Sequence, residues 1–199
     1  MTRLIVWRHG LTDSNASSRV QGQLDIPLNA VGRAQAAAAA AALAAWHPDA
    51  LVSSDLSRAL DTAAALAAVT GLPVSHDARL RERHFGVWQG LLLSEIESRY
   101  PAECAAWRAG SPSPGCAVES LDDMGKRVGE AFQEAAESVP GGTIVVVTHG
   151  GSARQGCGHL LGWPPAVLLT IGGLHNCHWT ELRHDGVRGW QLRAHNVGV

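Results

Sequence analysis

The order of apolar segments along this 199-residue chain predicts an α/β fold with three layers, in which helices cover both faces of a mainly parallel sheet. Short β-branched runs alternate with longer segments of helical character from the N-terminus onward. The two clearest strands, 4–8 and 143–148, are each followed by a histidine and a glycine. Ligands bind beyond the carboxyl ends of such strands, so we expect both histidines at a binding site.

The other elements follow from propensity and from breakers. Helix 32–46 is built on an unbroken alanine run, whose small side chains permit close packing on a sheet, and helix 56–69 stops at Gly-Leu-Pro. The segment 77–90 crowds charged and aromatic residues without periodicity, as an active-site loop does. Further strands are predicted at 50–53, near Val74, at 177–182 and at 189–194. Further helices are predicted at 92–107, with a break at Pro101, at 121–138 and from 150 to about 161.

Composition favours one domain over residues 1–199 and excludes several partners. A chain that is 46% hydrophobic buries one substantial core at this length. The net charge of -2 and the scattered basic residues argue against nucleic acid, and no apolar stretch reaches membrane-spanning length. The four cysteines form no Cys-x-x-Cys pair, so we expect reduced thiols in a cytoplasmic protein. A homodimer is the one assembly considered for it.

The tripeptide Arg8-His9-Gly10 is the first of four polar elements that carry the functional hypothesis. An imidazole at a strand end serves as a nucleophile, a base or a ligand, and the planar guanidinium of Arg8 suits phosphate oxygens. We expect Gly10 to bring a backbone N–H close to an anion. A purely structural role for this histidine is the alternative.

Arg58 is the second element, in the first turn of helix 56–69, where a cation is unfavourable for the helix dipole. It either faces an anion that the same helix end attracts or is a surface arginine. The third element surrounds Glu82, followed by Arg83 and His84, which are candidate substrate contacts. Glu82 is either an ion-pair partner or the proton donor that transfer from a poor leaving group requires.

The fourth element, His149-Gly150, places a second histidine and a flexible anion-binding turn at another strand end, although a structural histidine is the alternative. In this order the four elements resemble the histidine phosphatase superfamily, also called phosphoglycerate mutase-like, over essentially the whole chain. The resemblance implies a phosphoglycerate mutase-like fold. It also implies a phosphorylated His9, a phosphate pocket of Arg8, Arg58 and His149, supplementary contacts from Asn15 and Gln21-Gly22, and Glu82 as general acid.

The implied reaction is the metal-independent hydrolysis of a small phosphate monoester through a phosphohistidine. His9 attacks phosphorus, the arginines offset the charge of the equatorial oxygens, and Glu82 protonates the leaving alkoxide and later deprotonates water. No cofactor or metal ion is expected, because the arginines supply the positive charge. His175 and His178 offer the only metal-like spacing, and no third ligand accompanies them.

Two alternatives remain for the same fold. A cofactor-dependent phosphoglycerate mutase would return the phosphoryl group to its substrate, but mutases of this family have a longer segment after the Glu motif and a longer C-terminal tail. A non-catalytic module that binds phosphorylated ligands would be expected to lack His9 or Glu82, and both are present.

Substrate identity is the least defined property. The segments 83–88, 107–115 and 172–178 are expected to form the pocket walls, unless their tryptophans belong to the core. The runs 19–25, 88–91 and 172–179 resemble actinobacterial phosphatases that act on glucosyl-3-phosphoglycerate. A broad-specificity phosphatase, an α-ribazole phosphatase and a fructose-bisphosphatase are the alternatives.

Overall fold

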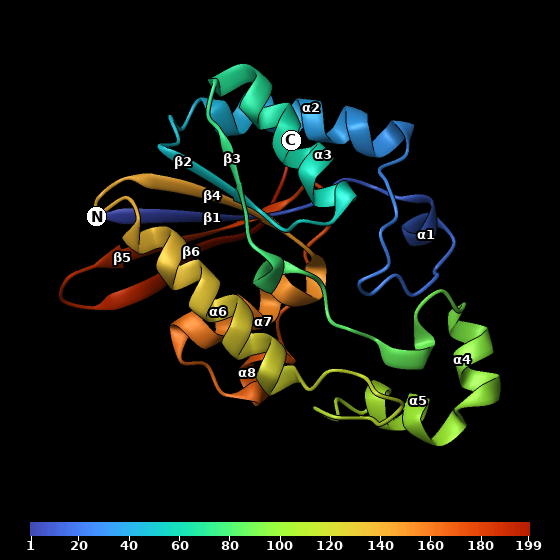
Figure 1. Cartoon of the computed structure of the whole chain (residues 1–199). Helices are drawn as coiled ribbons and strands as arrows, with labels where there is room; N and C mark the ends of the chain where they lie inside the picture. The colour runs from blue at the N-terminus through green and yellow to red at the C-terminus, as the bar shows by residue number, and fades with distance from the viewer.

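A computed structural model describes all of residues 1–199 and has the three predicted layers (Figure 1). The central sheet has six strands in the order β3-β2-β4-β1-β5-β6. The parallel strands are β1 (Thr2–Arg8), β2 (Ala50–Ser53), β3 (Val74–His76) and β4 (Thr143–Thr148). The sheet is completed by two antiparallel strands, β5 (Trp179–Asp185) and β6 (Gly189–Val197).

Two pairs of helices cover the sheet. One face packs against α2 (Ala30–Ala44) and α3 (Ser57–Thr70), and the other against α6 (Leu121–Glu137) and α7 (Gly150–Leu161) (Figure 1). The helices α4 (Leu93–Arg99) and α5 (Pro101–Arg108) lie apart from the sheet and enclose a smaller apolar cluster. The remaining short elements are α1 (Asp13–Ala16), α8 (Pro165–Leu168) and the 3₁₀ turns η1 (Ala78–Leu80) and η2 (Gly86–Trp88).

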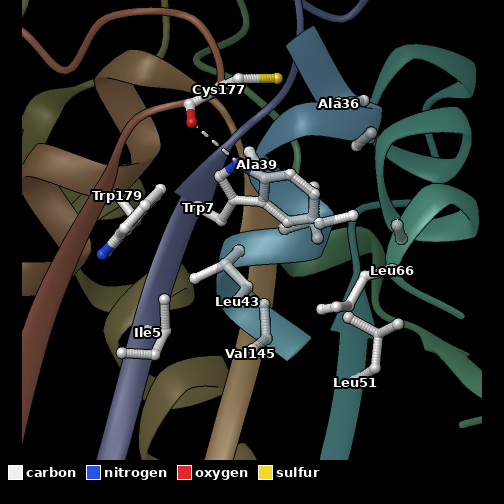
Figure 2. Close-up of a cluster of buried hydrophobic side chains, with 14 of the residues drawn as sticks. Ile5, Trp7, Ala36, Ala39, Leu43, Leu51, Leu66, Val145, Cys177 and Trp179 are labelled. Atoms are coloured by element: carbon white, nitrogen blue, oxygen red, sulfur yellow. Dashed lines mark hydrogen bonds between the residues drawn. The ribbon is translucent and has the colours of Figure 1, made fainter. Parts of the chain in front are cut away.

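Strand β1 is buried on both faces, which explains its unbroken apolar run. Ile5 and Trp7 point toward α2 and α3, whereas Leu4 and Val6 point toward α6 and α7. Figure 2 shows Trp7 packed beside Ala36 and Ala39, whose small side chains let α2 approach the sheet. The indole Nε1 of Trp7 donates to the carbonyl of Cys177 at 3.1 Å, so the large ring is buried without a lost hydrogen bond.

The predicted elements are confirmed in type and order, with ends shifted by a few residues. Pro101 begins α5, where its missing N–H removes no helical bond, and so it separates α4 from α5. The short helices α1 and α8 were not predicted, because four residues give no periodic signal.

Trp88 is 1% exposed among the residues of the α4–α5 cluster, so it belongs to a core and not to a pocket wall. None of the helices combines the length and apolar character that crossing a bilayer requires.

Candidate active site

The register of β1 and β4 brings His9 and His149 together. Arg8 pairs with Thr148 across these neighbouring parallel strands, so both histidines leave the sheet at the same edge. Their ring centroids are 5.1 Å apart and both side chains are buried. The two histidines that end the predicted strands therefore lie side by side at one edge of the sheet.

His9 has a defined neutral form. Its Nδ1 lies 2.7 Å from the carbonyl oxygen of Gly10. Because a carbonyl oxygen can only accept a hydrogen bond, Nδ1 carries the hydrogen and Nε2 keeps a lone pair. Burial, together with the cations Arg58 and Arg8, holds the pKa of His9 well below 6.5. The ring is thus neutral at neutral pH, with its Nε2 unprotonated.

His149 is fixed in the opposite tautomer. The Nε of Arg58 donates to its Nδ1 at 3.2 Å, and its Nε2 lies 2.9 Å from the hydroxyl oxygen of Ser54. Because the guanidinium can only donate, the proton of His149 is on Nε2 and points to Ser54. Burial and Arg58 also hold the pKa of His149 well below 6.5. The ring therefore orients Arg58 beside His9.

Arg58 holds the loop of residues 22–24 beside the two histidines. Its side chain is 1% exposed, and its two terminal nitrogens donate to the carbonyls of Leu24 and Gly22 at 2.7 and 2.8 Å. Burial lowers its pKa to about 10, an effect that nearby Glu82 partly offsets, so it stays charged at neutral pH. The first N–H of α3, at Ser57, donates to Asp25 at 2.7 Å. The helix end therefore attracts a carboxylate of the protein.

Arg8 approaches the pocket from β1. One terminal nitrogen donates to the carbonyl of Leu174 at 2.5 Å, whereas the buried Nε has no partner in the protein. Burial lowers the pKa of Arg8, and the negative charge of nearby Glu82 offsets only part of this shift. A Cβ added to Gly150 would lie 3.4 Å from that Nε, so a glycine at the start of α7 leaves room for the guanidinium.

Glu82 caps α7. Its Oε2 accepts one hydrogen bond, from the N–H of Gly151 at 2.9 Å. Its Oε1 accepts from the N–H groups of Arg83 at 2.9 Å and Ser152 at 3.1 Å. One lone pair of Oε2 therefore has no donor in the protein. The Gly150-Gly151 turn was expected to bind a ligand anion, but its second N–H binds this carboxylate instead.

Comparisons with known proteins show which family this sequence matches. Residues 4–198 match the sequence profile of the histidine phosphatase superfamily (branch 1). The chain belongs to the histidine phosphatase superfamily. It is 43% identical to the glucosyl-3-phosphoglycerate phosphatase of Mycobacterium tuberculosis over 99% of this chain and 95% of that protein.

Two further comparisons bear on the activity. A solved structure of mycobacterial glucosyl-3-phosphoglycerate phosphatase with VO3 superposes with a TM-score of 0.92 at 40% identity, covering 100% of both chains. A probable phosphoglycerate mutase of Yersinia enterocolitica is 36% identical over 98% of this chain and 92% of that protein. The prediction of a phosphate-monoester hydrolase of this superfamily is confirmed by the profile and by the named phosphatases.

The role expected for Gly10 in this histidine phosphatase needs correction. Its N–H donates to the hydroxyl of Thr62 at 3.1 Å and so is not free for an anion. A side chain on Gly10 would instead collide with the backbone carbonyl of Gly32. The glycine is required because the end of β1 passes directly against the start of α2.

Asn15 and Gln21 lie together in the loop after His9. The hydroxyl of Thr12 is 3.0 Å from Oδ1 of Asn15 and 2.9 Å from Oε1 of Gln21, which leaves both amide nitrogens as donors. Asn176, which lies in the segment 172–178 predicted as a pocket wall, contacts this loop directly. Its Nδ2 donates to the carbonyl of His9 at 3.0 Å and lies 3.3 Å from Oδ1 of Asn15, and no local pattern signals this contact across the chain.

Arg83 and His84 lie outside this cluster. The buried Arg83 donates to the carbonyls of Glu119 and Pro112 at 2.7 and 2.8 Å and lines a neighbouring cavity. His84 is exposed, and its Nδ1 accepts from the N–H of Gly86 at 3.1 Å. Of the predicted substrate contacts, Arg83 therefore faces a separate space beside Glu82, and His84 lies in a surface turn.

Acidification is expected to destabilise this histidine phosphatase through its two buried histidines. An unfolded histidine takes up a proton near pH 6.5, whereas both folded-state pKa values lie well below that. Below pH 6.5 the unfolded chain binds more protons, so the free energy of unfolding falls by up to about 1.4 kcal/mol per pH unit for each ring. Denaturant titrations at about pH 7.5 and about pH 5.5 measure the loss. His9→Ala should remove about half of it, and an unchanged pH dependence would contradict a neutral His9.

Proposed function

We propose that this chain hydrolyses small phosphate monoesters through a phosphohistidine at His9, without a metal ion. The observation that carries the proposal is the buried His9, whose Nε2 lone pair is free and whose ring is held neutral beside Arg8 and Arg58. A neutral imidazole is a competent nucleophile, and fixed guanidinium groups stabilise the charge that develops on the transferring phosphoryl group.

In the first half-reaction, Nε2 of His9 forms a bond to phosphorus while the bond to the alcohol oxygen breaks. Arg8 and Arg58 bind the equatorial oxygens, and the amide nitrogens of Asn15 and Gln21 add donors. A proton on Oε2 of Glu82 passes to the departing oxygen, so the alcohol leaves neutral.

In the second half-reaction, the ionised Glu82 takes a proton from water. The water oxygen attacks phosphorus, the bond to Nε2 breaks, and its electron pair returns to His9 as phosphate is released. The N–H groups that hold Glu82 at the start of α7 keep the carboxylate in one place during both steps. One carboxylate can therefore serve as acid and then as base.

For the substrate we propose a phosphate ester of a glycosylated hydroxy acid, of the glucosyl-3-phosphoglycerate class. The support is the likeness to the mycobacterial enzyme along essentially the full length of both chains. The chain also resembles a probable phosphoglycerate mutase, so mutase activity is the alternative that the assay must exclude.

A substrate panel assayed in EDTA tests this proposal. We expect the specificity constant for glucosyl-3-phosphoglycerate to exceed those for fructose 1,6-bisphosphate, α-ribazole phosphate and p-nitrophenyl phosphate by at least roughly 10-fold. Incubation of 3-phosphoglycerate with catalytic 2,3-bisphosphoglycerate should release inorganic phosphate and give little 2-phosphoglycerate. Efficient isomerisation would establish the mutase instead. Loss of activity in EDTA, with recovery on adding zinc or magnesium, would contradict the metal-independent mechanism.

A further inference from the structure

A concave site lies beside the cluster of His9, Arg8 and Arg58. It is a cavity of about 430 Å³ between α5, the start of α6, α7 and α8, and its volume falls within the range typical of ligand pockets. Aromatic and aliphatic walls from Trp107, Leu168 and Leu169 are combined with the guanidinium groups of Arg83, Arg108 and Arg154. The mechanism proposed above uses none of these side chains.

The cavity adjoins the catalytic carboxylate. Arg83, one of its walls, donates its backbone N–H to Oε1 of Glu82 at 2.9 Å. On α7, Gly151 faces Glu82 so closely that a Cβ there would lie 2.5 Å from Oε1. Arg154 is three residues further along and so on the same helix face, about one turn or roughly 5 Å along the axis of α7 from Gly151. A leaving group protonated by Glu82 would extend into this space.

The charge of the cavity favours an anion. Arg83 donates only to two backbone carbonyls, and the buried Nε of Arg154 has no partner in the protein. Neither guanidinium has a carboxylate within salt-bridge distance, whereas Arg108 is paired with Glu97 at 2.8 Å. Asp122 is the one acidic residue in the lining. Two buried or half-buried guanidinium groups thus have no carboxylate in direct contact.

We propose that this cavity binds the alcohol portion of the substrate and that Arg83 and Arg154 recognise a carboxylate on it. A planar guanidinium fork matches a carboxylate in a bidentate manner. Trp107 and the leucines provide an apolar wall against which a sugar ring or a similar body can pack. This inference rests on the proposed hydrolase, and it explains how a phosphate ester of an acid is selected over a neutral ester.

Arg154→Met tests the inference, because it removes the charge and retains much of the side-chain volume. We expect the specificity constant for glucosyl-3-phosphoglycerate to fall roughly 10- to 100-fold, mainly through KM, because a charge-assisted hydrogen bond to the bound ester is lost. Turnover of p-nitrophenyl phosphate, which has no carboxylate, should change by less than about 3-fold. Arg154→Lys should recover part of the loss, and the melting temperature shows whether each variant is folded.

Arg99→Met is the matched control. Arg99 is an exposed arginine on α4 that pairs with Glu95 outside the cavity, so its loss should leave both substrates unaffected. An equal loss for both substrates in Arg154→Met, or no loss, would overturn the carboxylate subsite while leaving the hydrolase proposal intact. A wild-type enzyme that hydrolyses p-nitrophenyl phosphate but does not favour the carboxylated ester would overturn the subsite and the substrate class together. Absence of phosphatase activity on every ester would instead reject the proposed hydrolase.

Discussion

Replacing His9 by alanine is expected to lower kcat by roughly 10⁴-fold or more, because no other group at the end of β1 is placed to accept the phosphoryl group. Arg8 and Arg58 remain in the variant, so binding of inorganic phosphate should persist. Steady-state kinetics with p-nitrophenyl phosphate measure the first effect, and calorimetric titration with phosphate measures the second.

His159→Ala is the control for this loss. His159 is exposed in the last turn of α7, far along the helix from His149, and its removal should leave kcat within about 2-fold of wild type. If the folded His9→Ala variant kept more than a small fraction of wild-type turnover, a covalent intermediate at His9 would be wrong.

Replacing Glu82 by glutamine is expected to slow the enzyme in a way that depends on the leaving group. An alkoxide must be protonated as its bond to phosphorus breaks, whereas p-nitrophenolate leaves with little help. Formation of the phosphoenzyme should therefore slow roughly 10²- to 10⁴-fold for glycerol-type phosphates and much less for p-nitrophenyl phosphate. Loss of the base should also slow hydrolysis of the phosphoenzyme, so p-nitrophenyl phosphate should give a burst of nitrophenolate.

Rapid mixing of both substrates with wild type and variant resolves these two steps. Glu130→Gln, an exposed position on α6, controls for the loss of one carboxylate. Equal slowing for the two leaving groups, with no burst, would mean that Glu82 acts only by positioning substrate or by capping α7. Another residue would then have to supply the proton.

Most of the fold could be predicted because its elements have strong local signals. The β-branched run that forms β4 strongly favours a strand, and the alanine run of α2 strongly favours a helix. Gly71, in a left-handed conformation, ends α3. The pairing of β5 and β6 as an antiparallel hairpin and the short helix α8 depend on contacts distant in sequence. Burial of Trp88 under α4 and α5 also depends on such contacts, so residue type alone could not distinguish a core position from a pocket wall.

The residues of the candidate site could be named from the sequence, but several of their contacts could not. The neighbouring strand ends of β1 and β4 explain why His9 and His149 meet. No local pattern shows that Gly10 donates to Thr62, or that Asn176 donates to the carbonyl of His9. The helix end at Gly151 looked like a ligand site, yet the structure places the carboxylate of Glu82 there. Each difference arises from a contact between segments far apart in the chain.

Mapping the phosphoryl group on the protein tests the central proposal most directly. Glu82→Gln is mixed with p-nitrophenyl phosphate, quenched in alkali to preserve phosphohistidine, digested, and analysed by mass spectrometry. The proposal predicts one phosphoryl group per chain on the peptide that contains His9, formed at the rate of the nitrophenolate burst and absent when His9 is also replaced by alanine. Phosphate on another residue, or nitrophenolate release at an undiminished rate from the doubly substituted protein, would contradict a phosphohistidine at His9.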